Sequence, residues 1–179
     1  MRKIILTLVG LSILGGTTLG GFALNVHAVE TINSQANVSI LGGPLSINGI
    51  EEMNFGNIEL NGKDQIKTGD SISVTFSDYR GSNNEGFELT VKSDSAFDNK
   101  GLNLKLNPTA SSDSQVTLAP EFEVTNELHQ VVIGEQEKLK GTATDYDVTV
   151  GNELIAAKSA KAGSYQSILT WNLTATPNE

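Results

Sequence analysis

The stretch Ile72-Ser-Val-Thr-Phe-Ser77 alternates apolar and polar residues at every position. The stretch Phe87-Glu-Leu-Thr-Val-Lys92 does the same, and the pattern returns at 102–107 and 121–125. Because successive side chains of a strand point to opposite faces, each stretch would place its apolar residues on one face of a sheet. The alternation therefore predicts strands with one buried and one wet face, as in antiparallel sheets.

Clusters of Gly, Asn, Asp and other turn residues separate the alternating stretches. They occur at 61–64, 81–84, 98–101 and 151–152. Residues 153–162 could form a short helix ended by Gly163, but we expect a strand at 153–156 followed by a loop. Short strands separated by turns at this spacing are typical of a sandwich or barrel. The sequence thus predicts an all-β fold, an antiparallel β-sandwich of the Greek-key or jelly-roll kind.

The N-terminal segment 1–28 has the composition of a secretory signal peptide. A basic start is followed by the apolar run 4–14, and the small residues Val26 and Ala28 precede the expected cleavage point. The alternative is an uncleaved membrane anchor, but the apolar segment contains glycines and is short for a membrane span. We therefore expect an exported mature chain, residues 29–179, that forms one domain.

The mature chain is strongly acidic and contains no cysteine. Without residues 1–28 it has 10 basic and 21 acidic residues, a net charge of −11. Such a surface repels polyphosphate, so we expect no nucleic-acid partner, and charge alone also disfavours anionic wall polymers. The lack of cysteine excludes disulfides, thiol nucleophiles, zinc–thiolate sites and a lipoprotein anchor. Since no apolar tail or sorting signal is apparent, we expect attachment to a cell to be noncovalent.

The residue pattern does not point to catalysis or to a bound metal. His129 is the only histidine of the mature chain, and no nucleophile or metal-binding motif accompanies it. The acidic clusters at 94–98 and 145–147 lack the spacing of a calcium loop, which favours solvated carboxylates. We expect no enzymatic activity, no cofactor and no metal site.

The C-terminal stretch Tyr165-Gln-Ser-Ile-Leu-Thr-Trp-Asn-Leu-Thr-Ala-Thr-Pro177 contains the sole tryptophan of the chain. Its large apolar residues with odd numbers would share one face of a strand. They are Tyr165, Leu169, Trp171 and Leu173. Pro177 would end the strand because proline has no N–H to donate. The stretch predicts a final strand that closes the core.

This pattern, Tyr-x-x-x-Leu-Thr-Trp-x-Leu-x-x-x-Pro, resembles the signature of the WxL domain family of Gram-positive surface proteins. The family also has an upstream motif, usually Trp-x-Leu followed by Thr or Ser and Val. Here Phe87-Glu-Leu-Thr-Val91 falls in its place, with phenylalanine instead of tryptophan. The stretches Ser77-Asp-Tyr-Arg-Gly81 and Gly43-Pro-Leu-Ser-Ile47 also resemble the family, and the resemblance covers residues 40–179.

The resemblance implies that residues 29–179 form a WxL-type cell-wall-binding domain. It implies a secreted protein of the cell wall and cell surface of a Gram-positive bacterium, attached noncovalently to peptidoglycan. It further implies a surface complex with a membrane-anchored WxL-interacting protein or other WxL proteins. The alternative hypothesis is an adhesin or interaction module that binds a host or substrate macromolecule and is held at the wall through such a partner. The charge leaves neutral sugars, a partner protein, or strand addition to a partner's sheet as modes of docking.

The motif residues are the candidate binding residues implied by the resemblance: Trp171, Leu173, Phe87, Leu89 and Tyr165. Two interpretations are open, because the rings of Trp171 and Phe87 could stack on wall sugars or could belong to a continuous apolar core face. Asp78 and Arg80 are a second candidate site. Arg80 could bind a carboxylate of a peptide stem, or it could pair with Asp78 inside the domain.

Overall fold

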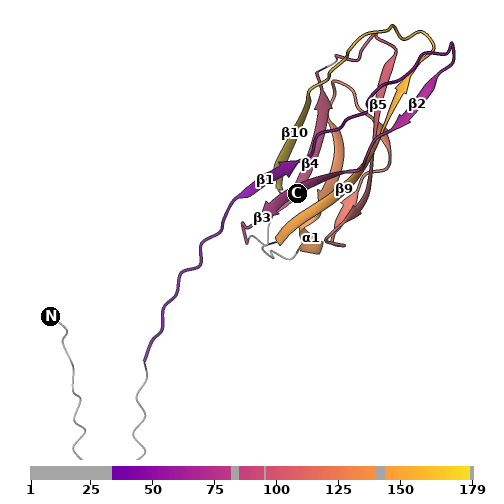
Figure 1. The fold of residues 1–179 in the computed structure, drawn as a ribbon. Coiled ribbons are helices and arrows are strands. Elements are labelled where there is room, and N and C mark those ends of the chain that lie inside the picture. The colour runs from indigo at the N-terminus through magenta and orange to yellow at the C-terminus, as the bar shows by residue number, and fades with distance from the viewer. Residues whose placement is uncertain (1–33, 82–84, 95, 140–143, 178–179) are drawn as a thin grey trace, which may run out of the picture. The chain divides into compact units, whose positions relative to one another are not determined.

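The computed structural model describes residues 34–81, 85–94, 96–139 and 144–177, which contain ten strands and one short helix (Figure 1). The expected signal peptide, residues 1–28, lies outside these described residues. The part of the chain from Ser39 onward forms one compact unit.

The elements follow one another as β1 (Leu45–Ile50), β2 (Gln65–Thr68), β3 (Ile72–Asp78), β4 (Glu85–Ser93), β5 (Leu102–Ser111), β6 (Val116–Leu118), β7 (Phe122–Glu123), β8 (His129–Gly134), α1 (Gln136–Leu139), β9 (Thr144–Ala156) and β10 (Leu169–Pro177). The four alternating stretches fall in β3, β4, β5 and β7, and the strand expected at 153–156 is the end of β9. β7 is shorter than the pattern at 121–125 predicts, because only Phe122 and Glu123 pair with β5.

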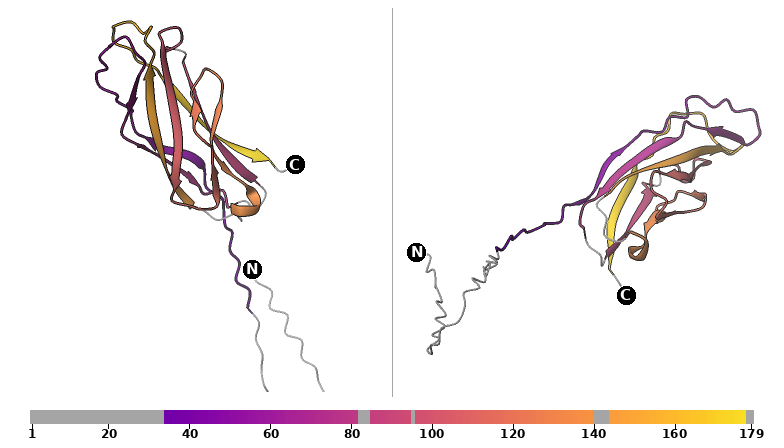
Figure 2. Two further views of the ribbon diagram at one scale, coloured as in Figure 1. Left: turned by 90° about the vertical axis from the view of Figure 1, so that its right-hand side faces the viewer. Right: turned by 90° about the horizontal axis from the view of Figure 1, so that it is seen from below.

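The strands form two antiparallel sheets that face each other as two layers (Figure 2). The first sheet has the order β1–β3–β9–β5–β7, and the second has the order β10–β4–β8–β6. β9, with 13 residues, organises the first sheet. Its early part pairs with β3, its late part pairs with β2, and β5 lies along its other edge. The predicted antiparallel β-sandwich is therefore confirmed.

The core lies between the sheets and consists of the inward-pointing residues of the alternating strands. The largest side chains without exposed surface are Phe76, Phe87, Leu89, Leu106, Val74, Val91, Val131, Val132, Val148 and Val150. Three rings meet in this core. Phe76 stacks on Tyr146 with ring centroids 4.8 Å apart, and the Phe87 ring packs edge-on against Phe76 at 5.3 Å and Tyr146 at 5.1 Å. Burial raises the pKa of Tyr146 to about 12, so its hydroxyl stays neutral in the folded domain.

The Phe87 ring lies directly over Gly134. The two residues are partners in the ladder between β4 and β8. A Cβ atom on Gly134 would lie 2.4 Å from Cε1 of Phe87, far inside van der Waals contact. Glycine at this position leaves the space that the ring fills.

β1 and β10 are the edge strands of the two sheets on the same side of the sandwich. In the described part of the chain, β1 pairs with β3 alone and β10 pairs with β4 alone. The two edges approach each other across the sandwich (Figure 1). The chain runs without regular structure from residue 51 to 64, after β1, and from 157 to 168, before β10. No strand in the described residues closes the sandwich between these two segments.

Candidate functional site

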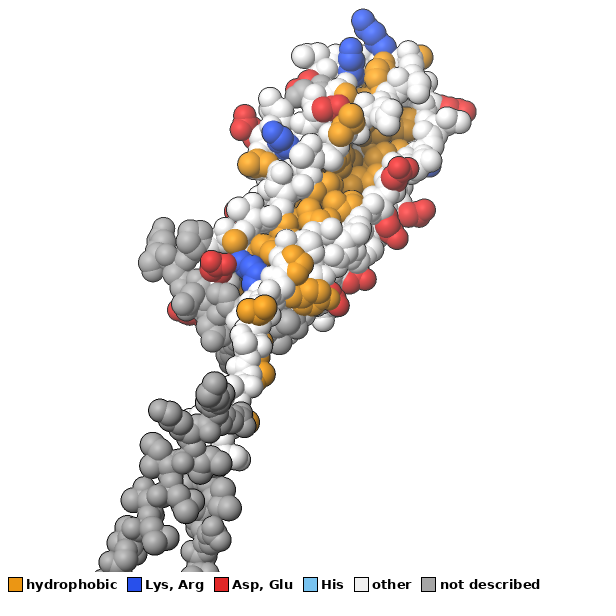
Figure 3. All heavy atoms as spheres, turned by 90° about the vertical axis from the view of Figure 1, so that its left-hand side faces the viewer, with side chains coloured by type: hydrophobic (Ala, Val, Ile, Leu, Met, Phe, Trp, Pro, Cys, Tyr) orange, Lys and Arg blue, Asp and Glu red, His pale blue; other side chains and the backbone are white. Residues whose placement is uncertain are grey.

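An apolar groove of about 1130 Å³ opens where the sandwich is not closed. Residues 50–60 line one wall and residues 160–171 line the other. The floor consists of buried side chains from β5 and β9, with one ring from the loop before β5: Leu102, Leu104, Leu154, Ala156 and Phe97. Figure 3 shows a continuous band of hydrophobic side chains along this face, with acidic side chains along one rim.

Both walls of the groove carry backbone groups without backbone partners. Within the described part of the chain, no backbone–backbone hydrogen bond involves residues 52–60 or 161–167. Side chains satisfy two of these groups, because Asn54 accepts a bond from the N–H of Gly56 and Tyr165 donates to the carbonyl of Lys161. An apolar floor between walls of unpaired N–H and C=O groups suits an extended peptide, which needs both kinds of contact.

Trp171 lines this groove without being enclosed. It is the partner of Val91 in the β10–β4 register, so both side chains point between the sheets. Val91 has no exposed surface, whereas Trp171 is only partly buried because no strand lies beyond β10. Tyr165 and Leu169 line the same groove. These three motif residues are therefore accessible to a ligand.

The other motif residues lie elsewhere. Phe87 and Leu89 are fully buried in the core, so a ligand cannot reach them while the domain is folded. Leu173, the ladder partner of Leu89, is partly buried against the core and is not among the residues that line the groove. The upstream motif therefore packs the core, and the C-terminal motif spans the boundary between core and groove.

Arg80 is bound within its own turn. Its Nη2 lies 2.8 Å from Oδ2 of Asp78 and its Nε donates to Oδ1 at 2.9 Å, while Nη1 reaches Glu85 at 2.9 Å. Nη2 also donates to the carbonyl of Gly86 at 3.0 Å. Burial would raise the pKa of Asp78, but the hydrogen bonds and charge of Arg80 outweigh it and hold that pKa below its ordinary value. The guanidinium donors are thus used to fix the turn between β3 and β4.

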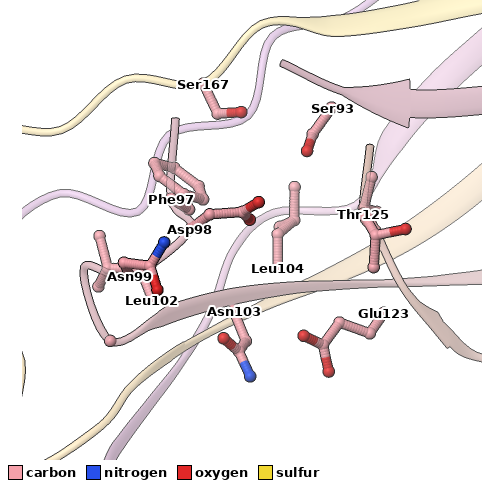
Figure 4. A pocket seen from close by; sticks show the side chains of 12 residues that line it. Ser93, Phe97, Asp98, Asn99, Leu102, Asn103, Leu104, Glu123, Thr125 and Ser167 are labelled. Carbon is pink, nitrogen blue, oxygen red and sulfur yellow. The ribbon is translucent and has the colours of Figure 1, made fainter. Parts of the chain in front are cut away.

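A smaller pocket of about 390 Å³ adjoins the groove and shares Phe97, Leu102, Leu104 and Ser167 with it (Figure 4). The Asp98 carboxylate points toward Leu104, whereas Asn103 and Glu123 lie on the opposite side of β5 from that leucine (Figure 4). In a site that orients a small polar ligand, the polar groups converge on one point. The polar groups of the smaller pocket do not. The apolar groove is the stronger candidate site.

The chain was compared with models of known protein families. A family model described as "WxL domain surface cell wall-binding" matches residues 30–177, nearly the whole chain. The chain belongs to the WxL domain family. The match confirms the resemblance carried by the stretch Tyr165–Pro177, and it makes this WxL protein a wall-associated protein of the cell surface. No curated protein matches the chain significantly.

Two further findings concern the described residues of this WxL protein. None of their helices has the length and apolar character needed to cross a membrane. They also contain no group of three or more His, Cys, Asp and Glu side chains placed to hold a metal ion. The matched WxL family is described by wall binding and is not known for catalysis.

No pattern in the sequence predicted the groove. Its walls are more than 100 positions apart in the sequence, and neither has the alternation that marked the strands. The one signal was the stretch 50–60, which carries Met53, Phe55 and Ile58 without any strand pattern. Large apolar residues in a stretch that forms no strand indicate a surface that packs against something else.

Proposed function

We propose that this WxL protein is secreted, attaches noncovalently to the cell wall and belongs to a surface-protein complex, in which its groove holds an extended strand of a partner protein. The open groove is the observation that supports this proposal. A partner strand would supply apolar side chains to the floor and backbone groups to both walls, which is recognition by strand addition. A glycan chain presents mainly hydroxyl groups and would find polar side chains only on the walls, because the floor residues are apolar.

The charge of the protein disfavours an acidic partner segment. Residues 29–179 carry a net charge of −11, and acidic side chains lie along the groove rim in Figure 3. Teichoic acids and other anionic wall polymers would be repelled. A strand of a membrane-anchored WxL-interacting protein or of another WxL protein fits the floor without this penalty.

The test compares two isoleucines of matched exposure. Ile168 is 64 % exposed and lines the groove, whereas Ile66 is 66 % exposed, lies on β2 and does not line it. Wild-type protein, Ile168→Asp and Ile66→Asp are incubated with walls that retain their surface proteins. They are also incubated with peptidoglycan stripped of protein and teichoic acid.

We expect wild-type protein to bind the protein-bearing walls more tightly than stripped peptidoglycan. Ile168→Asp should weaken that binding about tenfold or more, because a carboxylate would be buried without a partner. Ile66→Asp should bind like the wild type, and thermal denaturation should show all three proteins folded. Equal binding of the wild type to both preparations, unchanged by Ile168→Asp, would refute the proposal and indicate direct glycan binding at another surface.

A further inference from the structure

The segment before β1 has the pattern of a strand but joins no sheet. Between residues 32 and 40, the apolar residues all have even numbers: Ile32, Ala36, Val38 and Ile40. The odd-numbered residues between them are polar: Asn33, Gln35, Asn37 and Ser39. In an extended conformation this segment would have one polar face and one face that is apolar except at Ser34.

The described part of this segment leaves its apolar side chains in solvent. Residues 34–44 form no strand. Val38, Ile40 and Leu41 are 87 %, 89 % and 87 % exposed. Large apolar residues so close together on the surface mark an interaction site.

The backbone just before β1 is held in place by contacts with the end of β3. The N–H of Gly43 donates to the carbonyl of Tyr79 at 2.7 Å, and the N–H of Tyr79 donates to the carbonyl of Pro44 at 2.9 Å. A Cβ on Gly42 would lie 2.3 Å from the carbonyl oxygen of Arg80, so the chain passes very close to that turn. These contacts continue the β1–β3 pairing beyond Leu45.

The groove begins at the other end of β1. It is lined from Ile50 onward, which is about 17 Å from Leu45 at the usual rise of a strand. To enter its own groove, the segment would have to reverse direction at Leu41 and run back along β1. The segment of a second copy enters the groove without that reversal.

The charge of the segment is compatible with a second copy's segment as the occupant. Residues 31–41 contain no charged side chain, whereas residues 42–179 carry 10 basic and 20 acidic residues. The acidic bodies of two copies repel each other, but the neutral segment brings no charge to the acidic rim of the groove. The described residues 34–40 would span about 23 Å when extended.

We infer that residues 34–40 of one copy lie as an added strand in the groove of a second copy, so that these WxL chains associate head to tail. The inference rests on the proposed function, because it names the strand that the groove holds. The even-numbered apolar residues face floor residues such as Leu104 and Leu154, and the odd-numbered polar residues face solvent. Because segment and groove are different surfaces, the contact is heterologous and can propagate from copy to copy.

The test uses the purified mature protein alone, in sedimentation experiments over a range of concentrations. Wild-type protein should associate as its concentration rises, and more strongly at high salt, which screens the repulsion between acidic bodies. Val38→Asp with Ile40→Asp disables the segment, and Ile168→Asp disables the groove. Each variant alone should stay monomeric. An equimolar mixture of the two should form heterodimers, because one supplies an intact groove and the other an intact segment.

Matched controls separate this contact from general effects of charge. Asn37→Asp with Ser39→Asp adds the same charge to the polar face of the segment and should associate like the wild type, as should Ile66→Asp. Leu60→Asp, on the opposite wall of the groove, serves as a second groove variant should Ile168→Asp melt at a lower temperature.

The outcomes distinguish the inference from the proposed function. A monomeric wild type, a mixture without heterodimers, or association that survives Val38→Asp with Ile40→Asp overturns the inference. If in that case Ile168→Asp still loses binding to protein-bearing walls, the groove holds a strand of another protein and the proposed function stands. If Ile168→Asp keeps full wall binding, the proposed function fails regardless of the oligomeric state.

Discussion

Trp171 and Val91 are ladder partners whose side chains enter the same space between the sheets, yet Val91 is fully buried and Trp171 is not. The difference arises because β4 is an inner strand and β10 is an edge. Trp171 therefore packs against the core with one part of its ring and lines the groove with another. A ligand in the proposed groove would therefore contact a residue that also stabilises the core.

The first prediction compares the two aromatic motif positions. Phe87→Ala should lower the free energy of unfolding by about 3–5 kcal/mol, since it empties a fully enclosed site. Trp171→Ala should cost less, about 2–3 kcal/mol, because part of the ring already faces water. Urea denaturation of both variants measures the order, and a larger loss for Trp171→Ala would contradict this account of the edge.

The second prediction concerns the space above Gly134. Gly134→Ala should destabilise the domain by about 1–3 kcal/mol, because the new methyl group overlaps the Phe87 ring. Gly151→Ala is the control, since a Cβ there meets nothing closer than 3.5 Å. Thermal denaturation of both variants checks the difference. Equal melting temperatures would mean that the ring can move aside without cost.

The third prediction is a pH dependence of stability. The pKa of Asp78 is lower in the folded domain than its ordinary value of 3.8. Its contribution to stability is therefore complete above pH 3.8 and is lost as the pH falls through the lower, folded-state pKa. Asp78→Asn should flatten the acid limb of a plot of unfolding free energy against pH.

Asp78→Asn should flatten that limb only in part, because other carboxyls contribute in the same direction. Hydrogen bonds from Ser77 and Tyr79 lower the pKa of Asp145, and a bond from Ser167 lowers the pKa of Asp94. An acid limb as steep as that of the wild type would show that the Arg80 contacts contribute nothing to stability.

The fourth prediction is the mature N-terminus. Protein recovered from culture should begin at Val29, because Val26 and Ala28 provide the small residues that the signal peptidase requires. N-terminal sequencing measures this. Ala28→Leu should leave the precursor uncleaved, and intact Met1 on the wild-type protein in the membrane fraction would contradict the prediction.

The fifth prediction concerns attachment to the wall. Concentrated denaturant should release the whole protein from intact cells, because the proposed attachment is noncovalent and the sequence contains no cysteine. Mass spectrometry of the extract should give the mass of residues 29–179 without additions. Release only after digestion with a muramidase, with glycan fragments attached, would mean a covalent link.

The strands could be predicted because their physical cause is local. Ile72, Val74 and Phe76 are buried on one side of β3 as their spacing requires, and Leu102, Leu104 and Leu106 are buried in β5. The ion pair between Arg80 and Asp78 was one of two interpretations of the sequence, and only two positions separate the residues. In each case the interacting residues are neighbours in the sequence.

The groove depends on relations that a spacing pattern does not contain. Period-two alternation shows that Trp171 shares a face with Leu169, but it does not show that β10 lies at the edge of its sheet. Ile58 and Ile168 line one groove although 110 positions separate them. The role of Gly134 follows from its pairing with Phe87, which only the register between β4 and β8 supplies.

The pairing of Leu89 with Leu173 has a consequence for the order of folding. These ladder partners are 84 positions apart, and β10 is synthesised after every other strand of the two sheets. If the chain is threaded outward through a membrane from its N-terminus, β4 keeps an open edge until β10 has emerged. The pairing of β4 with β10 forms slowly, because residues far apart in the sequence must come together. A chain halted before Trp171 emerges would thus expose an unpaired strand edge to proteases and to neighbouring chains, so the emergence of β10 sets the earliest moment at which the domain can fold.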